Sequence, residues 1–218
     1  MKHGAVVLDL EVDVTPDEVY RYLGYRRGSQ RSEKAQQRLV ELWPRALSLL
    51  RPRGAYRVIE GAEAAAAGMP EAGSEVGVGL CTVGPALEET SAACAAGGDL
   101  LDALLLDAIG SAAAEAAADG LNLALCTVAA DAGMHAAPRV SPGYGSWDVS
   151  FQGRLLALLP AAELGVTLTT GQMMVPRKSV SLAVSFEKSP SKGHRPGSAC
   201  ERCGLERCRH RVAPMRGV

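Results

Sequence analysis

The feature that most constrains the fold is residues 99–119, DLLDALLLDAIGSAAAEAAAD, which are apolar almost throughout. Gly97 and Gly98 precede this stretch and Gly120 follows it. The sequence therefore predicts one long helix that begins after the glycine pair, with Asp99 as its cap, and stops at Gly120. Residues 121–131, LNLALCTVAAD, are then either a helix end or a strand. A helix that is apolar around its whole circumference has no face for solvent, so we expect it to be central.

The polar exceptions within this helix are regularly spaced. Asp107, Ser111 and Glu115 recur every four residues and therefore form a single stripe along one side. This pattern is typical of a solvated edge, and it is equally what a cleft wall lined with carboxylates requires. Both interpretations stay open from the sequence.

Shorter patterns on either side of the helix predict a mixed fold. Strands are expected at 5–12, 55–61, 75–84, 165–170 and 179–186, with 171–178 joining the last two, and helices at 15–25, 32–50 and 150–159. The first of these helices has Thr15 as N-cap, Pro16 at its first position and Glu18 three residues after the cap. The alanine run at 64–67 is a turn of helix or a loop. Since strands and helices do not alternate regularly, the expected class is α+β.

Composition limits the partners and the compartment. A net charge of −1 argues against a chain built as a whole to bind nucleic acid. No uninterrupted apolar run approaches the roughly 18 residues of a membrane span, so no membrane insertion is expected. The first residues lack the apolar stretch and cleavage site of a secretory signal, and we expect a cytoplasmic protein with reduced thiols. Cys81, Cys94 and Cys126 lie among small and apolar neighbours and are expected to pack as hydrophobic side chains.

The composition changes at Lys188, after which serine, proline, glycine and arginine dominate. We therefore divide the chain into a domain at 1–187 and a basic tail at 188–218. Cys200, Cys203 and Cys208 lie in this tail with the spacing C-x2-C-x4-C, in a segment too polar to be a core. The spacing favours a metal site: zinc with His194 or His210 as fourth ligand, or an iron–sulfur cluster that relays an electron. A flexible tail with incidental thiols is the alternative.

The stretch RVSPGYGSWDVSFQ, from Arg139 to Gln152, gathers a charge and aromatic rings around a tight turn. Pro142 and Gly143 fit the central positions of a type II turn, where glycine adopts a positive φ. The guanidinium of Arg139 suits a carboxylate, and Tyr144 adds a flat face and a hydroxyl. These groups could hold a small zwitterion that carries a ring, and an ordinary surface arginine beside a turn is the alternative.

RVSPGY resembles the R-x-x-x-G-Y motif of the activation domain of cobalamin-dependent methionine synthase, which binds S-adenosylmethionine. The segments EVGVGLCTVGPALEE, DAIGSAAAEAAADGLN and TTGQMMVPRKSVSLAVSF are similar to that family's strand, long helix and closing hairpin, in the same order from about residue 75 to residue 186. The N-terminal VYRYLGYR and the cysteine-bearing tail resemble its stand-alone members. The resemblance implies an α+β fold with an antiparallel sheet flanked by helices.

The resemblance also implies a function. In that family the domain presents S-adenosylmethionine to an oxidised corrinoid, and a methyl group with one electron from a reductase restores methylcobalamin. By this match Arg139 holds the ligand carboxylate, Gly143 and Tyr144 shape the pocket, and Glu115 is a weaker candidate. The chain departs from the larger enzyme at Gly133, where that enzyme has an acidic residue, and at EKSPSK, where it has two tyrosines.

The chain has no D-x-H-x-x-G corrinoid motif, so cobalamin must reside on a partner protein, and an electron donor must be a second partner. The expected role is a reactivation unit within a methyltransferase system. One alternative is a metal-binding redox or adaptor protein that keeps the fold and does not bind S-adenosylmethionine. A third interpretation, nucleic-acid binding through the basic tail, rests on charge alone.

Overall fold

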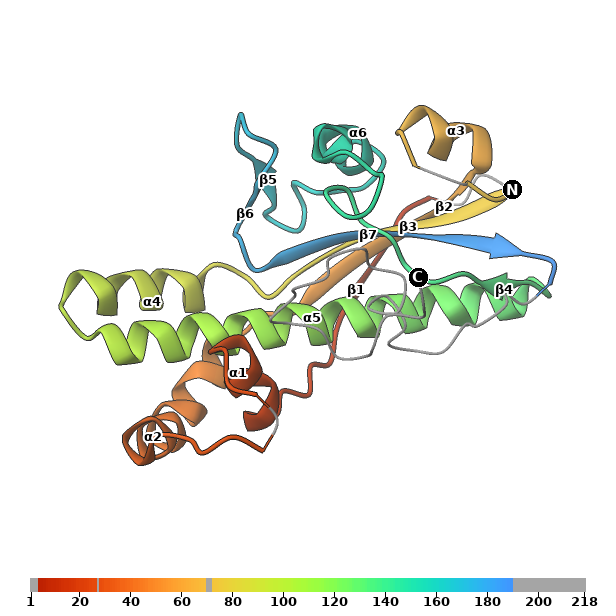
Figure 1. The fold of residues 1–218 in the computed structure, drawn as a ribbon. Coiled ribbons are helices and arrows are strands. Elements are labelled where there is room, and N and C mark those ends of the chain that lie inside the picture. The colour runs from red at the N-terminus through yellow and green to blue at the C-terminus, as the bar shows by residue number, and fades with distance from the viewer. Residues whose placement is uncertain (1–3, 27, 70–71, 190–218) are drawn as a thin grey trace.

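The computed structural model describes residues 4–26, 28–69 and 72–189, which form a five-stranded sheet between two layers (Figure 1). The strand order is β1-β2-β3-β7-β4, and every neighbouring pair is antiparallel. The strands are β1 (Val6–Asp9), β2 (Arg53–Glu60), β3 (Glu75–Thr82), β7 (Ser179–Glu187) and β4 (His135–Ala136). The predicted α+β class with an antiparallel sheet is confirmed.

Helices and a small hairpin cover the two faces of this sheet (Figure 1). One layer contains α1 (Pro16–Tyr22), α2 (Glu33–Leu49), α4 (Ala86–Ala96) and α5 (Leu100–Asp131). The other contains α3 (Gly61–Ala66), the 3-10 turn η1 (Val149–Phe151), α6 (Gln152–Leu156) and the hairpin of β5 (Thr167–Leu168) with β6 (Met174–Val175). Because both faces are covered, β3 and β7 are buried over nearly their whole length.

Glycines on β3 let α5 lie close to the sheet. Alternate residues of β3 point to opposite faces, and Gly77 and Gly79 occupy the face toward α5. A Cβ atom on Gly77 would lie 2.5 Å from Cδ2 of Leu125, and one on Gly79 would lie 2.8 Å from Cδ2 of Leu121. Only glycine therefore permits this separation, which sets how near the polar stripe of α5 comes to the edge of the sheet.

The predicted start of the long helix is confirmed, since Asp99 is the N-cap of α5, but its predicted end at Gly120 is wrong. α5 continues through Gly120 as far as Asp131, because Leu121, Leu125 and Ala129 bury their side chains against the core. This burial outweighs the roughly 1 kcal/mol that a glycine costs inside a helix. Asp99 occupies the N-cap position, but its side chain makes no capping hydrogen bond.

Other local predictions have mixed outcomes. The capping box of α1 is confirmed, since the Thr15 and Glu18 side chains each accept from the backbone of the other. The alanine run at 64–67 belongs mostly to α3. The segment 165–170 does not pair with 179–186: β5 pairs with β6, whereas β7 pairs with β3 and β4. Helix α4 was not predicted.

The boundary expected at residue 188 falls one residue after the end of β7. Cys200, Cys203 and Cys208, and the metal site predicted for them, lie outside the described residues. Within the described ranges, no helix is long and apolar enough to span a membrane. Cys81 is fully buried, and Cys94 and Cys126 are partly buried, as expected of packing cysteines.

Candidate ligand-binding site around Arg139

Arg139 is positioned by the edge of the sheet. The segment that follows β4 runs along β7: the Ala137 N–H donates to the Ser185 carbonyl at 2.8 Å, and Val140 and Ala183 exchange backbone hydrogen bonds at 2.9 and 2.8 Å. Val140 packs into the core on the α6 side of the sheet. Because neighbouring side chains on extended backbone point to opposite faces, Arg139 projects toward α5.

The predicted turn follows directly. The Tyr144 N–H donates to the Ser141 carbonyl at 3.2 Å, and Gly143 has a φ of +89°, as a type II turn requires at its third position. The Ser141 hydroxyl donates to the Ser181 carbonyl of β7 at 2.7 Å. The turn is therefore fixed to the same strand that positions Arg139.

Trp147 anchors the far side of the turn. Its indole is fully buried, and its Nε1–H donates to the Ala67 carbonyl at 3.4 Å. The Gly143 N–H donates to the Trp147 carbonyl at 2.7 Å. With both sides of the loop held, Tyr144 is presented outward with 72% of its surface exposed.

The Arg139 guanidinium meets two carboxylates of α5. Its Nη2 forms an ion pair with Glu115 and lies 3.3 Å from Oδ1 of Asp119. The Arg139 side chain is only 19% exposed, whereas Asp119 is 70% exposed. The structure thus brings together Arg139 and Glu115, both expected at one ligand site from the family resemblance, and adds Asp119.

One atom of this guanidinium has no partner among the described residues. Nη1 of Arg139 is buried and makes no hydrogen bond within them. A buried donor without an acceptor costs roughly 1–3 kcal/mol, and more when the group is charged. An acceptor on a ligand would remove this cost, so Nη1 marks a place where an anionic group is favoured.

Two weak acids beside these charges stay protonated. Burial raises the pKa of Tyr22, at the end of α1, to about 12, and the Glu115 carboxylate adds to the effect. Burial likewise raises the pKa of the Cys81 thiol to about 12, and Cys81 lies near enough to respond to the charges of Arg139, Glu115 and Asp119. The charge of the site is therefore set by the arginine and the two α5 carboxylates.

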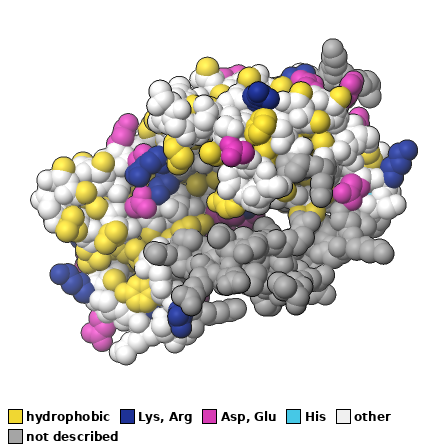
Figure 2. Space-filling model, turned by 45° about the horizontal axis from the view of Figure 1, so that its top comes forward, with side chains coloured by type: hydrophobic (Ala, Val, Ile, Leu, Met, Phe, Trp, Pro, Cys, Tyr) yellow, Lys and Arg dark blue, Asp and Glu magenta, His cyan; other side chains and the backbone are white. Residues whose placement is uncertain are grey.

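The first half of the polar stripe has partners of its own. Nζ of Lys178 lies 2.7 Å from Asp107 and donates to the Ser111 hydroxyl at 2.8 Å. Arg177 binds Glu88 of α4 through its Nε and its backbone N–H, at 2.9 and 2.8 Å. Each polar residue of the stripe therefore has a partner: Asp107 and Ser111 contact Lys178, and Glu115 pairs with Arg139. The stripe is not simply a solvated edge. On the face in Figure 2, basic and acidic side chains lie side by side.

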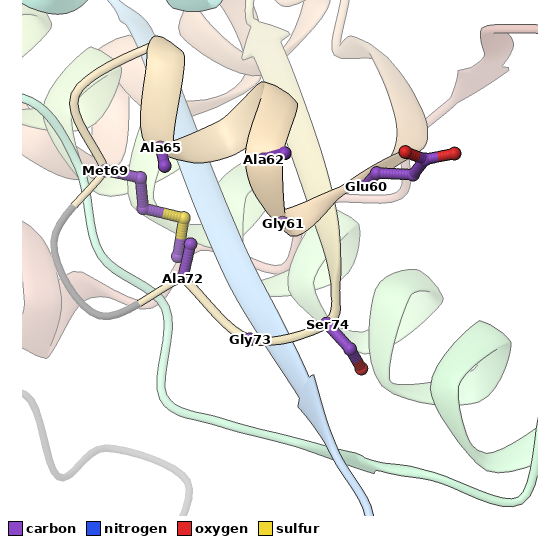
Figure 3. A pocket seen from close by; sticks show the side chains of 8 residues that line it. All are labelled: Glu60, Gly61, Ala62, Ala65, Met69, Ala72, Gly73 and Ser74. Atoms are coloured by element: carbon purple, nitrogen blue, oxygen red, sulfur yellow. The ribbon is translucent and has the colours of Figure 1, made fainter.

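A pocket of about 700 Å³ lies elsewhere, between α3 and the segment that leads into β3 (Figure 3). Its walls are mainly glycine, alanine and Met69, whose side chain runs toward Ala72. The carboxylate of Glu60 points away from the other labelled side chains. None of the predicted ligand-binding residues lines this pocket, and the described residues of its walls include no cation that could bind a carboxylate, so we place the candidate site at Arg139. Among the described residues, no group of His, Cys, Asp and Glu could hold a metal ion.

Comparison with solved structures finds the MetH reactivation domain bound to AdoHcy (S-adenosylhomocysteine). The match has a TM-score of 0.62 and 16% sequence identity, and it covers 87% of this chain and 80% of that one. The chain has the fold of the MetH reactivation domain. No protein-family model and no curated protein matches the sequence. The sequence analysis predicted a fold like the methionine synthase activation domain, from segments that follow the same order between residues 75 and 186. The structural match to the MetH reactivation domain confirms this prediction of the fold.

Two residues at the site were not predicted. Asp119 continues the four-residue spacing of the stripe by one step and lies inside the predicted helix, so extending the stripe to the last residue before Gly120 would have found it. Tyr22 comes from α1, far away in the sequence, and no local pattern places it beside Glu115.

Proposed function

We propose that the protein binds S-adenosylmethionine at the Arg139 site and acts as a reactivation unit for a corrinoid methyltransferase. In this role it supports the reductive methylation of an oxidised corrinoid held by a methionine synthase or a related enzyme. The observation that carries the proposal is the buried, unpartnered Nη1 of Arg139, on a scaffold that resembles a domain bound to AdoHcy.

The groups at the site complement the amino-acid end of this ligand. Nη1 of Arg139 offers a charge-assisted hydrogen bond to the ligand carboxylate. Glu115, which is less than half exposed, offers an acceptor for the ligand ammonium group. The exposed ring of Tyr144 offers a flat surface for the nucleoside, and Gly143 lets the ligand approach the backbone.

The chemistry of methyl transfer fits this arrangement. A sulfonium methyl group is already activated, so the reaction needs positioning of donor and acceptor more than it needs a general base. Cobalamin would supply the methyl acceptor from a partner protein, and an electron donor protein would supply the reducing equivalent. The residues of this chain would hold and orient the methyl donor.

Isothermal titration calorimetry of the full chain with S-adenosylmethionine and with S-adenosylhomocysteine tests the proposal. We expect saturable binding of about one ligand per chain. Absence of binding by both ligands would contradict the proposal and favour a metal-binding redox or adaptor protein that keeps the fold. With a ligand bound, the chain alone should still not methylate homocysteine, because the corrinoid resides on its partner.

A further inference from the structure

The charges around Arg139 do not balance. The positive charge of its guanidinium faces two carboxylates, Glu115 and Asp119, on successive turns of α5. Tyr22 and Cys81 remain neutral. Arg21 stacks over the Tyr22 ring at 5.2 Å, and Glu18 of the same helix also acts on Tyr22. Among the described residues, the groups in direct ionic contact at Arg139 therefore carry one excess negative charge before any ligand arrives.

We propose that Asp119 makes the site selective for a sulfonium ligand over the corresponding neutral thioether. The inference rests on the proposed function, since it concerns the same site. S-adenosylmethionine and S-adenosylhomocysteine share the carboxylate, the ammonium group and the nucleoside, and they differ by a methyl group and one positive charge on sulfur. A site with an excess negative charge attracts the sulfonium form more strongly.

Asp119 suits this role better than Glu115. Glu115 makes the direct contact with Arg139 and holds the guanidinium in place. Asp119 lies farther from the same Nη2, at 3.3 Å, and keeps 70% of its surface exposed. Its contribution to folding is small, because an exposed ion pair is worth at most about 1 kcal/mol. Its charge nevertheless acts on whatever binds beside Arg139.

This selectivity has a consequence for turnover. When the methyl group leaves, the electron pair of the S–CH3 bond stays on sulfur, and the cation becomes a neutral thioether. The attraction from Asp119 then ends, while the contacts to the carboxylate and ammonium group remain. The product is thereby held less tightly than the methyl donor, which favours exchange of one for the other.

The size of the effect follows from the exposure of Asp119. For a ligand sulfur bound several Å from Asp119, this solvent-screened unit charge would change the affinity for the cation by about threefold to tenfold at low salt. The expected signature is a change in the ratio of two affinities rather than a loss of binding.

The test compares Asp119→Asn with the wild-type protein by calorimetry, using both ligands at low ionic strength. Asp99→Asn is the matched control, since Asp99 is exposed and lies about 30 Å away along the same helix. We expect Asp119→Asn to lower the ratio of S-adenosylmethionine to S-adenosylhomocysteine affinity by about threefold to tenfold. Asp99→Asn and Asp119→Glu should leave the ratio unchanged.

Added salt provides a second readout that a purely structural role would not move. In the wild-type protein about 0.5 M salt should reduce the ratio, and in Asp119→Asn it should have little effect. An unchanged ratio in Asp119→Asn, with both ligands still bound, would overturn this inference and leave the proposed function standing. Binding of neither ligand by the wild-type protein would overturn both.

Discussion

Replacing Gly77 with alanine tests whether the glycines of β3 set the position of α5. The added Cβ would lie 2.5 Å from Cδ2 of Leu125 and 3.1 Å from Cζ of Phe186. Leu125 and Phe186 are both buried, so neither side chain can turn toward solvent. Overpacking of this kind costs about 1–3 kcal/mol. Alanine recovers about 0.5–1 kcal/mol through the lower entropy of the unfolded chain. We therefore expect a net loss of about 1–2 kcal/mol.

Gly120→Ala is the matched control, because Gly120 lies inside α5 itself. A Cβ there would be 3.7 Å from Cδ2 of Leu10, an ordinary contact. We expect this variant to be more stable than the wild type by about 0.5–1 kcal/mol, owing to the higher helix propensity of alanine. Urea denaturation followed by circular dichroism measures both. Equal or greater stability in Gly77→Ala would refute the reasoning.

Three further predictions concern the site and the tail. Tyr144→Ala should weaken S-adenosylmethionine binding without lowering the melting temperature, because the ring is largely exposed; calorimetry and thermal denaturation separate the two effects. Since folding raises the pKa of Tyr22 from 10.0 to about 12, its contribution to stability should be fully present below pH 10 and lost as the pH rises toward 12. The same loss should be absent in Tyr22→Phe, as denaturation at several pH values would reveal. Finally, anaerobically purified protein should contain zinc, or iron with sulfide, bound by Cys200, Cys203 and Cys208; three freely titrating thiols with neither metal would contradict this.

The sequence predicts the parts of the fold that depend on local patterns. The capping box at Thr15 and the turn at Pro142-Gly143 each combine residues a few positions apart, so one short segment contains the whole signal. Helix α4 has no such signal: it buries only Leu87 and Ser91, and most of its other side chains are alanine. Its burial depends on α5, which follows it, and no pattern within α4 reveals that contact.

The composition of the site could be predicted only in part. Arg139, Gly143 and Tyr144 come from one stretch that resembles a known motif. Glu115 and Arg139 meet for two reasons. Backbone hydrogen bonds to β7 position the segment that contains Arg139, and the glycines of β3 allow α5, which contains Glu115, to pack close to the sheet. These are tertiary contacts, and residue spacing alone does not fix them. For the same reason no local pattern could place Tyr22 beside Glu115.

The most direct test of the account is the affinity of Arg139→Ala for S-adenosylmethionine, measured by calorimetry beside the wild type. The loss of a charge-assisted hydrogen bond of about 2–3 kcal/mol predicts binding weaker by roughly a hundredfold, in a protein that stays folded. Arg57→Ala is the matched control, because Arg57 is also partly buried and pairs with Glu63 at 3.5 Å, but on β2. That variant should bind as the wild type does. Unchanged affinity in Arg139→Ala would contradict the central claim that Arg139 anchors the ligand.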